Sequence, residues 1–385
     1  MQKLRSRKQS LDFRQEEVGR IMTRWRASDS CSLIGVGSVG KSNLLQHLVD
    51  PEVQAFYMDV ANAEKFRAIL VDPALLGAMP NTDTSDYDQF CAWAGYELLM
   101  HRLYLAFQPL DAFLHPDDAA GFVSLYAEFH DGDNPLFKYM GLRYLELGLE
   151  YFMRAGIQIV FMFDEFDEML RQLPVKFFQA LRGLRDINKK QLSYLTFTRK
   201  PILDVAVDVG MDLLDIEPFA ELFTDSVVYV GPYNKKDARS MIQNLMKRNS
   251  KDYDEDVQTF LSWSTGGYAG LLRAGFRALE TLENLDANTI MRSSEHLAYQ
   301  LAAHPGVREE CRTIWTSLSE DERLMLREIA RVRPNINLND AHTKRVASLL
   351  TNKRLFQVRE QEVVIEPPVF HAFVKSNPDI NYEHT

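Results

Sequence analysis

Cysteine is scarce in this sequence, with three among 385 residues. Cys31, Cys91 and Cys311 are odd in number and far apart, and the sequence contains no CxxC pair or Cys/His cluster. Such a pattern argues against a disulfide framework and against a zinc site built on cysteine. We therefore expect three reduced thiols in the core.

Long apolar runs and an excess of positive charge are also missing. No stretch reaches about 18 consecutive apolar residues, and the basic residues 1–8 lack the apolar segment of a secretory signal, so we expect a cytoplasmic protein without a membrane role. The 44 Lys and Arg residues are outnumbered by 54 Asp and Glu residues, a net charge of −10. The chain as a whole repels a phosphate backbone, and any DNA binding requires a local basic patch.

Five short segments predict strands. Helical stretches separate them, which favours an α/β fold: a parallel five-stranded sheet with helices on both faces. Between the second and third strands, residues 65–155 are rich in aromatic residues and predict a helical insertion without a legible function, with turns at 81–86 and 131–135. The predicted strands are residues 31–35, 55–60, 157–163, 192–198 and 226–230.

Beyond residue 232 the pattern becomes helical. Residues 235–247, 254–263 and 269–282 predict a small helical lid, and residues 308–366 then predict three helices and a two-stranded ribbon, the order of a winged helix. Three domains are expected: a nucleotide-binding domain (1–232), a helical lid (233–300) and a winged helix (301–385). No repeat of 20 to 50 residues is visible, which excludes a solenoid or propeller.

The first predicted strand leads into GVGSVGKS, which fits the phosphate-loop pattern G-x-x-x-x-G-K-[ST] between a strand and a helix. Glycines let backbone N–H groups converge on phosphates, and the following helix adds its positive end. Lys41 is expected to reach the β- and γ-phosphates of ATP, and Ser42 to bind Mg²⁺. The alternative is a glycine-rich turn without ligand. The expected nucleotide-binding residues are Gly35, Val36, Gly37, Ser38, Val39, Gly40, Lys41, Ser42 and Asn43.

Carboxylates follow the third predicted strand. Asp164 fits the acid associated with Mg²⁺, and Glu165 fits the residue that polarises the attacking water; a solvated acid after a strand is the alternative. Asp167 and Glu168 are interpreted as acids at a helix N-terminus, where the helix dipole favours them. Together with the phosphate loop, Asp164 and Glu165 predict a P-loop ATPase of the additional-strand-catalytic-Glu type.

Arginines supply the remaining candidates for contact with the γ-phosphate. Arg199 follows the fourth predicted strand and can report whether ATP or ADP is bound, with a plain surface arginine as the alternative. Arg182 and Arg185 lie on a predicted helix, where they are either arginine fingers acting on a second copy or part of a solvated helix face.

The motifs GVGSVGKS, DEFDE, TFTRK, VGPYNKKDA and STGGYAGLLR, taken together, resemble the signal-transduction ATPases with numerous domains (STAND) and the related archaeal origin-recognition ATPases of the AAA+ class. The resemblance covers about residues 10–375. It implies that Arg199 senses the γ-phosphate, that Pro232 packs on adenine and that Arg273 occupies the second sensor region. It also implies an adenine-side role for Phe13 and Arg14.

The favoured hypothesis is a switch that binds ATP with Mg²⁺ and hydrolyses it slowly, moving the lid and winged helix to control oligomerisation or a separate protein partner. One alternative is a DNA-associated AAA+ ATPase in replication, transposition or mobile-element defence. Another is a nucleotide-stabilised scaffold without turnover. For DNA, the candidates are Lys344 and Arg345 on the expected recognition helix and Lys353, Arg354 and Arg359 near the wing. The resemblance instead implies that the winged helix packs within its own chain.

Overall fold

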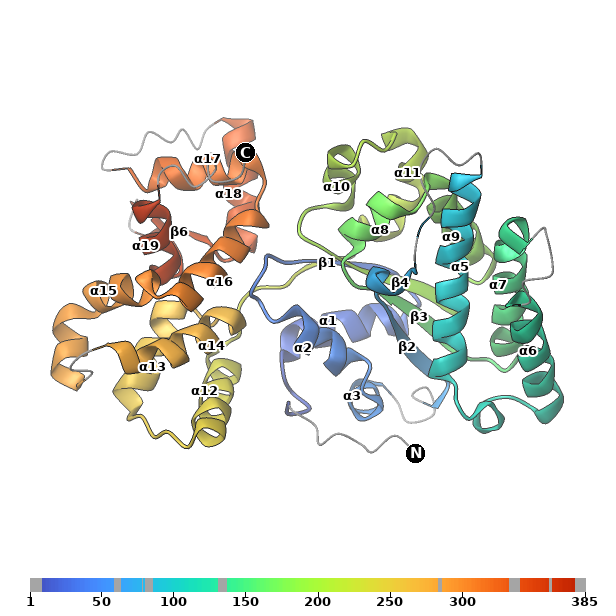
Figure 1. Cartoon of the computed structure of the whole chain (residues 1–385), viewed down its shortest axis with the longest axis horizontal. Coiled ribbons are helices and arrows are strands. Elements are labelled where there is room, and N and C mark those ends of the chain that lie inside the picture. The colour runs from blue at the N-terminus through green and yellow to red at the C-terminus, as the bar shows by residue number, and fades with distance from the viewer. Residues whose placement is uncertain are drawn as a thin grey trace. The chain divides into compact units, whose positions relative to one another are not determined.

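The computed structural model describes residues 9–58, 64–77, 79, 86–130, 137–282, 286–331, 340–359 and 362–377. The chain divides into two compact units (Figure 1). The first comprises Met1–Ile34 and Leu44–Val228, and the second comprises Gly35–Asn43 and Tyr229–Thr385. Within the described residues, no helix combines the length and apolar character needed to cross a membrane. The three cysteines are buried and free, as expected.

A five-stranded sheet in the order β2-β3-β4-β1-β5 organises the first unit. The pairs β2 with β3, β3 with β4 and β4 with β1 are all parallel. Every residue of β1 and β4 is buried. In β4 the buried residues include Ser193, Thr196 and Thr198 beside the apolar ones. The strands are β1 (Cys31–Ile34), β2 (Phe66–Val71), β3 (Gln158–Phe163), β4 (Leu192–Thr198) and β5 (Val227–Tyr229).

Helices cover both faces of this sheet. Figure 1 shows α1 and α3 on one side and α5, α8 and α9 on the other. The connection from β1 to β2 contains α3, and the connections from β2 to β3 and from β3 to β4 contain α5, α8 and α9, so right-handed crossovers require these two groups to lie on opposite faces. The predicted α/β fold class is thereby confirmed. The helices are α1 (Gln15–Arg26), α2 (Lys41–Leu48), α3 (Pro51–Tyr57), α5 (Tyr87–Ala106), α6 (Pro116–Phe129), α7 (Phe137–Arg154), α8 (Phe166–Gln172), α9 (Val175–Ile187), α10 (Ile202–Asp208) and α11 (Leu213–Ala220).

The strand predicted at residues 55–60 is wrong. Residues 51–57 form α3, and the second strand is Phe66–Val71. Asp50 caps this helix by accepting a hydrogen bond from the Glu52 N–H, and Pro51 occupies the first turn. Both residues favour the start of a helix, although the aromatic residues that follow favour a strand. The helical insertion therefore begins only after β2. Residues 59–60 and the predicted turns at 81–85 and 131–135 lie outside the described residues.

The second unit contains helices and one antiparallel ribbon, β6 with β7. Three helices precede that ribbon, which confirms the element order predicted from the sequence. The domain boundaries at residues 232 and 300 stay predictions. The elements are α12 (Lys235–Asn249), α13 (Glu255–Thr265), α14 (Ala269–Ala278), α15 (Ala287–Ala303), α16 (Pro305–Thr316), α17 (Glu320–Ile329), α18 (Ala341–Asn352), β6 (Phe356–Arg359), β7 (Glu362–Ile365) and α19 (Pro368–Ser376).

A buried ion pair ties α17 to the end of α18. Lys353 Nζ donates to both carboxylate oxygens of Glu322, at 2.6 and 2.9 Å, and both side chains are 1% exposed. The Lys353 carbonyl also accepts a hydrogen bond from the Tyr268 hydroxyl at 2.7 Å. The prediction that Lys353 is a surface cation near the wing is wrong, because its ammonium group is enclosed in the core. Arg354 is exposed, and the Arg359 side chain lies outside the described residues.

Candidate nucleotide site

Three strands of the first unit end in candidate motifs at one edge of the sheet. β4 lies between β1 and β3, and all three run in parallel, so their carboxyl ends coincide. β1 leads into Gly35, β3 into Asp164 and β4 into Arg199. Open parallel sheets bind ligands at this edge. The carboxyl ends of β1, β4 and β3 therefore lie side by side at that edge.

The phosphate loop, defined here as residues 35–42, is part of the second unit. Ser38 and Gly40 have positive φ angles of 68° and 89°. A Cβ on Gly40 would lie 2.7 Å from the Tyr233 hydroxyl oxygen and 2.9 Å from Ala269 Cβ, so glycine is required on both grounds. Left-handed residues within a turn direct successive N–H groups toward one concavity, which suits an anion.

Helix α2 begins at Lys41, and its first turn contains no carboxylate. The positive end of the helix is therefore left available to an anion. Ser42 is exposed and Lys41 is half-buried. Asn43 is oriented by a hydrogen bond from its Nδ2 to the Tyr233 hydroxyl, at 2.9 Å. These backbone and side-chain donors fit a polyphosphate.

Asp164 and Glu165 turn the chain from β3 into α8. The Asp164 N–H donates to the Val71 carbonyl at 2.9 Å, which continues the parallel pairing by one residue. Asp164 Oδ1 accepts the Glu165 N–H at 2.8 Å, and Glu165 adopts a left-handed conformation with φ of 45°. A non-glycine residue in this region costs about 1–3 kcal/mol and is over-represented at functional sites. The turn leaves the Glu165 side chain exposed.

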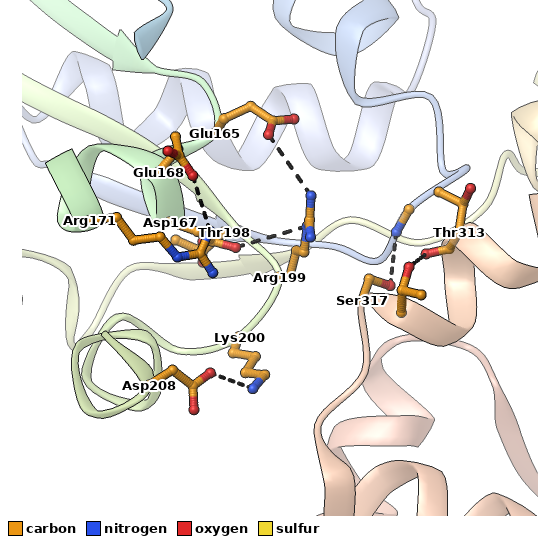
Figure 2. Close-up of polar contacts among 12 residues, drawn as sticks. Glu165, Asp167, Glu168, Arg171, Thr198, Arg199, Lys200, Asp208, Thr313 and Ser317 are labelled. Atoms are coloured by element: carbon orange, nitrogen blue, oxygen red, sulfur yellow. Dashed lines mark hydrogen bonds and ion pairs between the residues drawn. The ribbon is translucent and has the colours of Figure 1, made fainter. Parts of the chain in front are cut away.

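Arg199 lies between the carboxylates of Glu165 and Asp167. Its Nη2 is 3.9 Å from Glu165 Oε2, and its Nε is 4.0 Å from Asp167 Oδ2 (Figure 2). The Arg199 side chain is 52% exposed. The structure thus brings Arg199 and Glu165 together, and it adds Asp167, which the sequence identified only as a helix N-terminal acid.

Glu168 lies within the first turn of α8, where it was expected. Its carboxylate accepts hydrogen bonds from Gln172 and Arg171, at 2.7 and 3.0 Å. The Gln172 hydrogen bond is the main cause of the lowered pKa of Glu168, and Arg171 adds to it. Glu168 is therefore engaged along its own helix rather than with Arg199.

Both alternative arginine fingers have partners within the first unit. Arg182 donates to Asp186 Oδ2 at 2.8 Å and to the Pro218 carbonyl at 2.7 Å. The side chain of Arg185 is 17% exposed and lies 4.0 Å from Asp186 Oδ1. A role on a second copy requires these contacts to break first.

The candidates for the base side of the nucleotide are spread over both units. Phe13 is buried and packs edge-on against His47 at a ring distance of 5.3 Å, while Arg14 is 1% exposed and pairs with Glu17 at 3.0 Å. In the second unit, Pro232 is half-buried and Arg273 is exposed on α14. Phe13 and Arg14 are thus part of the core in this conformation.

Contacts with the phosphate loop also come from residues that the sequence did not identify. The Gly37 N–H donates to Ser317 Oγ at 3.1 Å, and Ser38 Oγ donates to Glu310 Oε2 at 2.8 Å. A Cβ on Gly37 would lie 2.5 Å from Thr313 Cγ2 and 2.8 Å from the Thr313 carbonyl oxygen. Residues 37 and 317 are 280 positions apart, and no local pattern marks such a pair.

No protein-family model matches this chain, and no curated protein matches it. Solved structures with a similar fold include a Walker-type ATPase of Pyrococcus abyssi, at 16% identity and a TM-score of 0.49 over 97% of this chain and 99% of the other. The Aeropyrum pernix ORC2 protein is 14% identical with a TM-score of 0.41, over 98% and 96%. The Thermotoga maritima RuvB branch migration motor is 11% identical with a TM-score of 0.40, over 98% and 99%. At these identities and TM-scores the likenesses say nothing about the activity of this chain.

Proposed function

We propose that this chain is an ATP-binding molecular switch that hydrolyses ATP slowly. The observation that carries the proposal is the shared sheet edge: β1, β4 and β3 lie side by side and lead into the phosphate loop, Arg199 and Asp164 respectively. If Asp164 were only a solvated acid and Arg199 only a surface arginine, they would have no need to lie at the same sheet edge as the phosphate loop. Phosphoryl transfer needs them there, because it depends on positioning and on charges held around the phosphates.

Each residue of the proposed site has a defined role. Lys41 and the loop N–H groups hold the β- and γ-phosphates, and Arg199 senses the γ-phosphate. Ser42 and Asp164 would hold a magnesium ion, which would neutralise phosphate charge. Glu165 orients and polarises the attacking water. Pro232 packs on the adenine, and Arg273 lies in the second sensor region.

Slow turnover is supported by one feature of the sequence. Residues 211–225, which precede β5, contain no arginine that could act as a finger in a neighbouring copy. A site of this kind favours reporting the nucleotide state over rapid hydrolysis.

The output of the switch is proposed to be oligomerisation or release of a partner protein in the cytoplasm. A DNA-associated role remains the second candidate, because Lys344 and Arg345 are both exposed on α18. Duplex binding at about 50 mM salt that is lost in a Lys344→Glu/Arg345→Glu variant would favour DNA. Absence of binding at this low salt would count against it.

The proposal is tested by calorimetric titration of ATP and ADP into the wild type and a Lys41→Ala variant, together with phosphate release. Loss of the lysine charge should weaken ATP binding by roughly 100-fold, because a charged hydrogen bond to two phosphates disappears. Lys247→Ala, on the exposed end of α12, is the matched control and should bind like the wild type. Unchanged affinity and turnover in Lys41→Ala would overturn the proposal. Tightly held ADP without any phosphate release would instead identify a scaffold.

A further inference from the structure

Helix α16 and the residue that caps it lie on the phosphate loop within the second unit. Ser317, at the carboxyl end of α16, is 3% exposed and accepts the Gly37 N–H (Figure 2). One turn earlier, the Thr313 methyl and carbonyl leave no room for a Cβ on Gly37. One further turn earlier, Glu310 accepts a hydrogen bond from Ser38. Glu310, Thr313 and Ser317, which are spaced by one turn each, therefore contact the phosphate loop from one side of the helix.

The hydrogen-bonding atoms that α16 and Ser317 present to the loop are oxygen acceptors. Ser317 Oγ supplies an acceptor for a loop N–H, and Glu310 supplies a negatively charged carboxylate at 2.8 Å from Ser38 Oγ. Phosphate groups offer the loop the same chemistry, namely oxygens with negative charge. A carboxylate and a phosphate on neighbouring donors repel each other, and more strongly where water is excluded.

Helix α14, part of the predicted helical lid, also contacts the phosphate loop. The Gly270 N–H donates to the Ser38 carbonyl at 2.9 Å, so α14 fixes the backbone of the loop. A Cβ on Gly270 would lie 2.0 Å from Glu310 Oε2 and 2.2 Å from Ser38 Oγ. Any larger residue at position 270 would clash with both the Glu310 carboxylate and the Ser38 hydroxyl, which hydrogen-bond to each other beside α14. Loop, lid and α16 are thus packed at van der Waals distance around the Glu310 carboxylate.

We propose that α16 is a built-in competitor of the nucleotide phosphates, with Glu310 and Ser317 holding the phosphate loop in a closed state that ATP and ADP can enter only after α16 moves away. This inference rests on the proposed function, since it assumes that nucleotide binds at the loop. It adds the regulation of that site. The apparent affinity for nucleotide then equals the affinity of the open loop multiplied by the fraction of open molecules.

The test compares nucleotide affinity in charge-neutral variants of α16. Glu310→Gln keeps the size of the side chain and removes its charge, and should lower the Kd for both ADP and ATP by about tenfold. Glu309→Gln is the matched control, because Glu309 lies next along the same helix, is exposed and contacts Arg312 at 3.4 Å. Ser317→Ala removes the second acceptor and should also tighten binding.

The outcomes separate this inference from the proposed function. Tighter binding in Glu310→Gln than in Glu309→Gln supports the inference, also where the wild type binds too weakly to measure. Binding by the wild type that is unchanged or weaker in Glu310→Gln overturns the inference and leaves the function standing. No binding by the wild type or by either charge-neutral variant, each shown to be folded by circular dichroism, overturns the proposed function and the inference with it.

Hydrogen exchange on the unmodified wild type provides a second measurement that does not depend on a variant. Saturating ADP should increase exchange at the amides of α16, because the helix leaves the loop and its carboxyl-terminal turn loses packing. Unchanged exchange in α16 at saturating nucleotide would overturn the inference even if the affinities follow the expected order.

Discussion

Arg199 and Glu165 contact each other across neighbouring strand ends, with Nη2 of the arginine 3.9 Å from Oε2 of the glutamate. Arg199 follows β4, Glu165 follows β3 by two residues, and these two strands are paired in parallel. These are the two residues proposed to sense the γ-phosphate and to polarise water. On that proposal, a bound γ-phosphate would compete with Glu165 for Arg199 and would release the carboxylate for water, which would couple sensing to hydrolysis.

Glu165→Gln should abolish most hydrolysis while preserving ATP binding. The amide keeps the size of the side chain but cannot polarise water, so the rate of phosphate release should fall by roughly 100-fold to 10,000-fold. Calorimetric titration should show ATP affinity within about twofold of the wild type. Glu168→Gln is the control, because Glu168 is engaged by Gln172 and Arg171 along α8. Equal rates in the wild type and Glu165→Gln would remove Glu165 from the site.

Arg199→Gln should weaken ATP binding and leave ADP binding unchanged, because only ATP carries the phosphate that Arg199 is proposed to sense. We expect a roughly tenfold higher Kd for ATP, from the loss of one charge-assisted contact. Parallel titrations of both nucleotides provide the measurement. Arg171→Gln is the control, since Arg171 is an exposed arginine paired with Glu168 on the same unit. Equal losses for ATP and ADP would contradict a sensing role.

Much of the central sheet could be predicted because its strands are buried on both faces. β1 and β3 are mostly apolar, and β4 is rich in threonine and aromatic residues, which favour strands. Glycine, aspartate and arginine follow these strands, and the strand ends were predicted to within one residue. β2 was missed because Arg67 interrupts its apolar pattern. The Arg67 side chain folds back to donate to the Phe66 carbonyl at 2.7 Å and lies over the Phe113 ring. Such accommodation by tertiary contacts is not visible in a local pattern.

The candidate site could be predicted only where its chemistry follows a strand. The phosphate loop, Asp164 and Arg199 each directly follow a strand of the sheet, so predicting the strands also located these residues at the sheet edge. Glu310 and Ser317 could not be found this way, because neither follows a strand, and an acid or a serine near the end of an amphipathic helix gives no local signal of a contact with the loop. Their positions on the loop depend on how segments about 270 to 280 residues apart pack in the second unit.

Removing one partner of the buried Lys353 and Glu322 pair should destabilise the second unit strongly. Lys353→Met leaves the Glu322 carboxylate buried without its counter-charge, at a cost of about 3–5 kcal/mol. Urea unfolding followed by circular dichroism measures the loss. Lys344→Met, at an exposed position of α18, is the control and should change the free energy of unfolding by less than about 0.5 kcal/mol.

A Lys353→Met/Glu322→Leu double variant sharpens this test. It removes both buried charges at once and should recover most of the lost stability, because no uncompensated charge remains in the core. Additive losses in the double variant would show that the two side chains contribute independently and would contradict a coupling between their charges.

The pH dependence of stability should report the pair formed by His130 and Glu97 in the first unit. His130 Nε2 lies 2.9 Å from Glu97 Oε1, and this hydrogen bond is the main cause of the raised pKa of His130. A raised folded-state pKa stabilises the fold fully below the ordinary histidine pKa of about 6.5, and the contribution is lost as the pH rises through the folded value.

Glu97→Gln should therefore lower the free energy of unfolding more at about pH 6 than at about pH 9, by roughly 0.2–1 kcal/mol for such a partly exposed pair. Urea unfolding of the wild type and the variant at both pH values measures the difference. Glu146→Gln is the control, because Glu146 pairs at 2.7 Å with Arg143, whose charge does not change over this range. If Glu97→Gln costs the same at both pH values, His130 carries no proton that depends on Glu97, and the pair acts as a neutral hydrogen bond.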